Sequence, residues 1–374
     1  MANKGEWSEP YAAIRLLGDR KLFVADENGE RNNQEWMDIL KLIRYETVEK
    51  ENRIVSYNCI DSDSNINIFV NDNFCSSVPA ERFFNIANML AEEIKNGSGS
   101  SFLVSNGIMD FLKEVNILSL KAKSINKSDI FLNIRDPRAS ITRENVGFSI
   151  KSDFGKPPTL FNTAKASAVV YRVTNMTDEL MEEINCIFDD RGHAAVMDRC
   201  ERILSENCEL IFEGYPVAER AGCKAFQENL DLIDPRLGQV IERILWNHFV
   251  HRENRLDISD VTQRLVEENP CNLSRPEVKY PYMMKSFLYA AYCGMTASTL
   301  WDGTNQVNGG FIKVSADGEV LVHYALESDA FKSYLYSHCF LDFPSTSEGH
   351  GHYAKVYKEN GQYYFRLNFQ IKYR

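Results

Sequence analysis

The chain has 374 residues, 44% of them hydrophobic and 25% charged, and a formal net charge of −11 at pH 7, which fits one large domain or two to three packed lobes. This composition excludes an intrinsically disordered chain. The sequence has no long uninterrupted apolar segment, so we expect neither a secretion signal nor a membrane span. Nine cysteines without a Cys-x-x-Cys pair disfavour a disulfide framework and a zinc ribbon, so we expect a reduced, cytoplasmic protein with no membrane partner.

The first half of the chain alternates between helical and strand periodicity. Apolar residues recurring every three to four positions predict helices over 8–18, 34–45, 79–95 and 105–115. Two β-type runs over 53–60 and 65–71, separated by a turn-rich tetrapeptide, predict a hairpin. Runs rich in branched and aromatic residues predict three strands of one sheet, over 128–134, 146–151 and 167–173.

The second half is first helical and then returns to strand periodicity. Helices are predicted over 178–189, 194–206, 235–250, 260–268 and 280–292. Asp-Gly and Asn-Gly turns predict two hairpins, with strands over 311–314 and 319–324 and over 353–358 and 362–372. The sequence thus predicts an α/β core with a mixed central sheet over 1–178, a helical lobe over 179–295 and a β-rich DNA-binding segment over 296–374.

An aspartate and a lysine stand on two successive predicted strands. Asp129 heads the strand over 128–134, Lys151 ends the next strand, and Ser149 shares the face of Lys151 because strand side chains alternate. If the two strands are antiparallel neighbours, these residues resemble a PD-(D/E)xK nuclease site in which Ser149 takes the position of Asp or Glu. Mg²⁺ bound to a carboxylate activates water, and an ammonium adds positive charge, so Asp129 is predicted to bind Mg²⁺ and Lys151 to orient or deprotonate water.

A second carboxylate is expected, since Mg²⁺ commonly uses one or two of them. The candidates are Glu6, Glu9, Asp136 and Asp153. Glu9 is preferred, because a helix that carries a carboxylate against the sheet edge is common in this class of nuclease. Asp153 alternates onto the face of Lys151 but lies at the end of the strand, and is kept as a further metal ligand. An aspartate and a lysine at this spacing also occur as a turn cap and an edge-strand charge.

Motifs from one end of the chain to the other resemble the HpaII family of type II restriction endonucleases. They lie at residues 5–9, 121–124, 127–130, 147–152 with Gly155, 158–162, 301–303, 309–311, 344–347 and 367–371. The resemblance implies cleavage of double-stranded DNA at a short palindrome, with CCGG as the best-known target, alongside a cognate DNA methyltransferase. The chain departs from the family pattern at Glu348 and Lys372, where arginine is usual, so the resemblance does not fix the target.

The residues predicted to contact DNA are Lys156, Thr159, Asn162, Lys165, His350, Lys355 and Gln370. The first four follow the strand of Lys151, although Pro157 and Pro158 are equally typical of a helix start. The others lie in residues 350–374, which carry five basic side chains and one acidic one. A metal site at His350 and His352 is disfavoured, because no thiolate or carboxylate stands at ligand spacing.

Two alternatives to a site-specific nuclease remain open. Ser149 in the carboxylate position is compatible with a catalytically weak DNA-binding protein of the same fold, and a related enzyme could act on modified or branched DNA. A palindromic target favours a homodimer, because a two-fold protein matches two-fold DNA, but one subunit can also cut each strand in turn.

Overall fold

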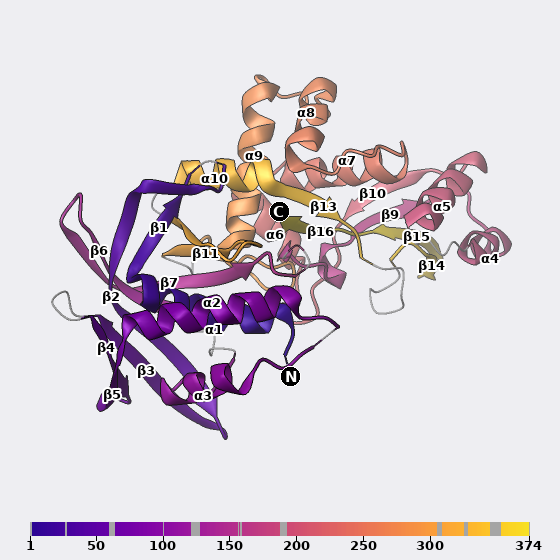
Figure 1. Ribbon diagram of the computed structural model, residues 1–374. Coiled ribbons are helices and arrows are strands. Elements are labelled where there is room, and N and C mark those ends of the chain that lie inside the picture. The colour runs from indigo at the N-terminus through magenta and orange to yellow at the C-terminus, as the bar shows by residue number, and fades with distance from the viewer. Residues whose placement is uncertain are drawn as a thin grey trace. The chain divides into compact units, whose positions relative to one another are not determined.

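The structure, a computed structural model, describes residues 2–26, 28–59, 64–99, 101–120, 128–155, 157, 159–187, 193–304, 309–324, 328–344 and 353–373. The chain forms two compact units (Figure 1), the first comprising residues 1–158 and 306–334 and the second residues 159–305 and 335–374. The predicted ranges 1–178, 179–295 and 296–374 divide the chain by type of secondary structure and stay a prediction. Among the described residues, no helix is long and apolar enough to cross a membrane.

A nine-stranded mixed sheet is the centre of the first unit, in the order β1-β12-β11-β7-β6-β2-β3-β4-β5. Its strands are β1 (Lys21–Ala25), β2 (Arg31–Val48), β3 (Glu51–Cys59), β4 (Asn65–Val70), β5 (Asn73–Pro79), β6 (Ile130–Asp136), β7 (Ile141–Ser152), β11 (Gly310–Val314) and β12 (Val320–Tyr324). The pairs β1–β12 and β11–β7 are parallel. Because β1 also pairs with β2, six of the strands close into a ring. The predicted mixed α/β architecture is confirmed.

Three helices of the first unit pack with this sheet, namely α1 (Lys4–Asp19), α2 (Ala80–Asn96) and α3 (Asn106–Glu114). Figure 1 shows α1 and α2 side by side. Their close approach depends on Gly18, because a Cβ there would lie 2.6 Å from the backbone nitrogen of Phe84. A capping box between Asn3 and Glu6 fixes the start of α1, since each side chain accepts a hydrogen bond from the other's backbone N–H.

The predicted helix over 34–45 is wrong, because these residues belong to β2. Met37, Ile39 and Leu42 are the buried apolar residues of this stretch, and the pairing register with β6 shifts between Ile39 and Lys41. The extra residue of this bulge converts a spacing of two into a spacing of three. The helix prediction rested on Trp36, Ile39, Leu40 and Ile43, of which only Ile39 is buried, so the helical spacing does not follow the inward face of β2.

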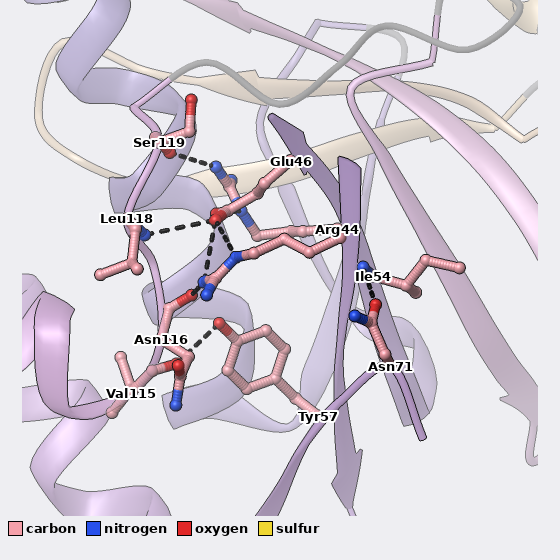
Figure 2. Close-up of polar contacts among 10 residues, drawn as sticks. Arg44, Glu46, Ile54, Tyr57, Asn71, Val115, Asn116, Leu118 and Ser119 are labelled. Carbon is pink, nitrogen blue, oxygen red and sulfur yellow. Dashed lines mark hydrogen bonds and ion pairs between the residues drawn. The ribbon is translucent and has the colours of Figure 1, made fainter. Parts of the chain in front are cut away.

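A buried charge network occupies the next inward positions of β2 (Figure 2). Arg44 and Glu46 are both fully buried, and Arg44 Nε lies 3.3 Å from Glu46 Oε1. Arg53 on β3 donates to Glu46 Oε2 at 3.1 Å, and the amide of Leu118 donates to the same oxygen at 3.3 Å. Arg44 also donates to the carbonyl of Ser119 at 2.9 Å. Glu46 therefore joins the buried Arg44 to the half-buried Arg53 and anchors the segment that follows α3.

The second unit combines helices with two small sheets. Its helices are α4 (Asp178–Cys186), α5 (His193–Ser205), α6 (Ala225–Ile233), α7 (Leu237–Phe249), α8 (Ile258–Glu268) and α9 (Pro276–Tyr292), while α10 (Ser328–His338) spans the boundary between the units. One sheet has the order β10-β9-β15-β14 and the other β13-β16-β8. Their strands are β8 (Thr159–Phe161), β9 (Val169–Val173), β10 (Leu210–Gly214), β13 (Cys339–Asp342), β14 (Val356–Glu359), β15 (Gln362–Leu367) and β16 (Gln370–Tyr373).

Two strand predictions in this unit are wrong. The run over 167–173 does not join the sheet of β6 and β7, because β9 pairs with β10 and β15. The run over 362–372 is two strands, β15 and β16, which lie in different sheets. They separate at the fully buried Asn368, whose side chain bonds to the turn η1 (Lys165–Ser167) and to Ala164 before it. The other predicted helices and the three hairpins are confirmed, whereas β1, β5, β8, β10, β13, α6 and α10 were not predicted.

Glu242 of α7 is expected to make the stability of the protein depend on pH. Burial raises the pKa of Glu242, and the Tyr171 hydroxyl, which donates to its Oε1 at 2.8 Å, only partly opposes this. A carboxyl group whose pKa is higher in the folded than in the unfolded protein stabilises the native state at low pH. This stability is lost as the pH rises from about 4.3, the pKa of Glu242 in the unfolded chain, through its higher pKa in the folded protein. Glu242→Gln keeps an acceptor for Tyr171 without the charge. We expect its unfolding midpoint, relative to wild type, to rise between pH 4 and 7; a difference independent of pH contradicts this.

Candidate active site

The antiparallel pair β6–β7 fixes the position of Asp129. The amide of Asp129 donates to the carbonyl of Phe148 at 2.8 Å, and the amide of Ile150 donates to Asp129 Oδ2 at 2.7 Å. Strand β6 begins at Ile130, which pairs with Phe148, so β7 runs on beyond the start of its neighbour. The Asp129 carboxylate thus takes the place of a strand partner for Ile150. It lies beside the segment of β7 that contains Ser149 and Lys151.

The charge of Asp129 is poorly solvated. Burial raises the pKa of Asp129, while the Ile150 amide, the nearby Lys151 ammonium and a hydrogen bond from the Ser149 hydroxyl oppose the increase. Ser149 itself is 7% exposed. A half-buried carboxylate whose charge is only partly compensated gains from an added cation. The structure therefore brings Asp129, Ser149 and Lys151 into one electrostatic group.

Helix α1 brings Glu9 to the same cavity as Lys151. The cavity has a volume of about 560 Å³, and Glu9, Ile150, Lys151 and Ser152 are among its lining residues. The hydroxyl of Ser8 lies 2.7 Å from that of Ser152, which holds α1 against the end of β7. Asp129 does not itself line the cavity, but its carboxylate contacts the amide of the lining residue Ile150.

The other candidate carboxylates have different surroundings. Asp153 Oδ2 lies 3.2 Å from the ammonium of Lys313, which also donates to the Tyr334 hydroxyl at 3.0 Å. Asp136 lies at the opposite end of β6 from Asp129 and contacts Arg138 at 3.3 Å. Glu6 accepts the N-cap hydrogen bond of α1. Among the described residues, Glu9 is the candidate carboxylate that lines the cavity of Lys151.

Lys313 is a residue that sequence analysis missed. The parallel pairing of β11 with β7 places Lys313 in register with Lys151, and Lys313 is 9% exposed. Two lysines on adjacent strands repel each other, and the contact with Asp153 offsets the charge of Lys313. The sequence contains no signal for this arrangement, because the two strands are separated by most of the second unit.

The described residues predicted to contact DNA all lie in the second unit. Asn162, Lys165 and Lys355 are exposed, and the Lys165 ammonium lies 3.6 Å from Glu219. Thr159 pairs with Lys372 in the sheet of β8 and β16. Gln370 Nε2 donates to Asp342 Oδ2 at 2.7 Å. Lys156 and His350 lie outside the described residues.

The donors around Asp129 suit a weakly coordinated metal ion. Within the described ranges, no three His, Cys, Asp or Glu side chains gather to hold a metal. Mg²⁺ does not require such a group, because it keeps several waters and binds one or two carboxylates with substrate phosphate. Asp129, whose charge is only partly compensated, and Glu9, which lines the cavity, carry carboxylates of the kind that Mg²⁺ binds.

Comparison of the chain with known proteins identifies its family. The family model for the HpaII restriction endonuclease matches residues 3–373. The chain is 33% identical over 373 residues to the Type II restriction enzyme HpaII of Haemophilus parainfluenzae, covering 99% of this chain and 98% of that protein. No solved structure matches the chain. Since both matches extend over almost the whole length, the predicted resemblance is confirmed: the chain belongs to the HpaII restriction endonuclease family and is a type II restriction endonuclease.

Proposed function

We propose that this enzyme hydrolyses double-stranded DNA at a short palindrome, with CCGG as the first target to test, in a Mg²⁺-dependent reaction at a PD-(D/E)xK-like site. The supporting observation is the convergence at the end of β7. Asp129 is held there by the amide of Ile150, and Lys151 and Glu9 line one cavity.

Each residue of this site has a role that follows from its surroundings. A bound Mg²⁺ would supply an activated water and neutralise phosphate charge. Asp129 and Glu9 would hold it, with Asp153 as the remaining predicted ligand, although Asp153 pairs with Lys313. Lys151 contributes a fixed positive charge in the cavity that orients water and stabilises charge on the attacked phosphate. Ser149 helps to lower the pKa of Asp129 but brings no charge of its own.

Digestion of plasmid DNA by the full-length protein tests the proposal. The reactions contain Mg²⁺ or EDTA and use unmodified plasmid, the same plasmid methylated at CCGG, and a branched duplex. Sequencing of the fragment ends is expected to show one palindrome, cut only with the divalent ion. Ends without a shared palindrome, or cleavage limited to modified or branched DNA, favour the alternative substrates.

The proposed target implies two partners. A palindrome matches a two-fold protein, so we propose a homodimer on DNA, which sedimentation with a CCGG duplex measures. Cleavage at so short a site endangers the host genome, so we also propose a cognate methyltransferase that protects it. Lys156, Thr159, Asn162, Lys165, His350, Lys355 and Gln370 stay the proposed DNA contacts.

Glu9→Gln is expected to lower the cleavage rate by about 10²-fold or more, because the neutral amide no longer supports a metal ion. DNA affinity measured without divalent metal should be unchanged. Single-turnover cleavage and fluorescence anisotropy measure the two effects. The matched control is Glu81→Gln, an exposed glutamate in the first turn of α2, which should cut as wild type does. If Glu6→Gln loses activity and Glu9→Gln does not, the assignment moves to Glu6.

A further inference from the structure

A second cavity, of about 500 Å³, lies within the second unit and is lined by basic residues. Lys165, Arg220 and Arg366 contribute three positive charges, and Glu219 is the single acidic residue among the described lining residues. The whole chain carries a net charge of −11, so this local excess of cations runs against the overall balance. Such a cluster of positive charges favours the binding of an anionic ligand.

A buried asparagine fixes two of these cations relative to each other. Asn368 Nδ2 donates to the carbonyl of Ala164 at 2.8 Å, and the Ser167 hydroxyl donates to Asn368 Oδ1 at 3.0 Å. Ala164 and Ser167 bracket the turn that carries Lys165, while Arg366 precedes Asn368 by two residues. The Arg366 guanidinium is further supported by the ring of Tyr357, 4.7 Å away. The bonds of Asn368 fix the backbone at Lys165 relative to the backbone at Arg366 before any ligand binds.

A second buried asparagine holds the wall that contains Ser298. Asn229, 1% exposed, donates through Nδ2 to the carbonyls of Thr296 at 2.9 Å and Thr299 at 2.8 Å. The segment between these two carbonyls, including the cavity-lining Ser298, is thereby tied to α6. The wall is built by specific hydrogen bonds, and it presents a hydroxyl to the cavity.

Arg220 lies in a tight turn of the loop that follows β10. The amide of Gly222 donates to the carbonyl of Ala218 at 2.8 Å, and the amide of Ala218 donates to the carbonyl of Cys223 at 2.8 Å. Gly222 has φ of +68°, a backbone conformation that glycine adopts without strain. The turn therefore presents Arg220 from a defined backbone.

Two of the cavity's cations, Lys165 and Arg220, are weakly engaged by the protein. Lys165 and Glu219 are 3.6 Å apart, and their side chains are 62% and 85% exposed, so screening leaves their pairing little strength. None of the ion pairs within the described part of the chain involves Arg220. An anion that enters the cavity can therefore contact Lys165 and Arg220 without breaking a strong ion pair within the protein.

We infer that this cavity binds a backbone phosphate of the DNA, with Arg220 and Lys165 supplying the charge contacts and Arg366 and Ser298 the supporting donors. The inference rests on the proposed function, since the ligand is the duplex that the enzyme cuts. Exposed lysine and arginine side chains around a hollow match the charge of a phosphate without selecting a base. The site therefore contributes affinity and register, and the choice of sequence is made elsewhere.

Fluorescence anisotropy of the full-length protein with labelled duplexes tests this site. Titrations without divalent metal use a CCGG duplex and a scrambled one, at salt concentrations from about 50 to 200 mM. Arg220→Gln should weaken both duplexes equally, by about three- to tenfold, and reduce the slope of log affinity against log salt by about 0.9. Adding Lys165→Gln should reduce the slope by about twice that amount. The control is Arg202→Gln, an exposed arginine of α5 paired with Glu183 and Glu206, which should bind as wild type does.

The outcomes separate this site from the proposed function. Unchanged affinity and salt slope in Arg220→Gln overturn the phosphate site, even if wild type cuts at a palindrome. A loss confined to the CCGG duplex also overturns it, since that result indicates contact with a base. If wild type cuts no DNA but Arg220→Gln shows the equal loss and the lower slope, the phosphate site stands while the proposed function fails. Because Arg220 is exposed, its variant should melt as wild type does.

Discussion

Lys151→Ala should reduce DNA cleavage by about 10²- to 10⁴-fold, the range found when a group that assists proton transfer or charge stabilisation is removed. Lys151 lines the cavity beside Ile150, and its charge acts on Asp129. No ion pair within the described ranges involves Lys151, so its removal should cost little stability. Single-turnover cleavage of a duplex with the mapped target measures the loss, and circular dichroism checks the fold.

The control for this variant is Lys113→Ala, an exposed lysine of α3 that lies 3.7 Å from Asp110. It removes the same charge from the same unit and should leave the cleavage rate unchanged. Asp129→Asn should resemble Lys151→Ala, because both act on one electrostatic group. If Lys151→Ala cuts plasmid as fast as wild type under single-turnover conditions, the active site lies elsewhere in the chain.

Glu46→Ala should lower the free energy of unfolding of the first unit by about 3–5 kcal/mol, because breaking a buried ion pair leaves uncompensated charge. Glu46 accepts from Arg44, Arg53 and the amide of Leu118 (Figure 2), and its side chain is 0% exposed. Removing it leaves two guanidinium groups with no anion between them. A fall in melting temperature of roughly 10 °C is expected for a unit of this size.

Thermal denaturation followed by calorimetry measures this effect, because two units need not unfold in one transition. The matched control is Glu114→Ala, which removes a carboxylate from the exposed pair with Arg82, where the side chains are 43% and 49% exposed. Exposed pairs contribute roughly 0–1 kcal/mol, so the control should melt within a few degrees of wild type. Equal shifts for Glu46→Ala and Glu114→Ala would show that the buried network carries no special stability.

Local patterns predicted most elements correctly and failed where a distant contact decides the outcome. The bulge between Ile39 and Lys41 altered the strand period, and the inward charges Arg44 and Glu46 hid the alternation that follows it. The period of β9 identified a strand but not its sheet, since its partners lie tens of residues away in β10 and far along the chain in β15. Asn368 ended a strand through its side-chain bonds to a turn some two hundred residues earlier.

The part of the candidate site that lies on two consecutive strands could be predicted from the sequence. Asp129, Ser149 and Lys151 belong to β7 and the residue before β6, so alternation and a short connection were enough to place them together. Glu9 was chosen by analogy with related nucleases, and it lines the cavity of Lys151. The pairing of Lys313 with Asp153 depends on the register of β11, which no local pattern encodes.

Strand β11 has a consequence for when the nuclease first becomes active during its synthesis. Phe311 and Lys313 pair with Ser149 and Lys151, so one edge of β7 stays open until residues 310–314 have left the ribosome. Residues 159–305 of the second unit are made in the interval. Pairing between strands so far apart in the chain forms slowly. We expect unfinished chains that lack residues 310–314 to be inactive, so that the host genome meets a working nuclease only after these residues have been made.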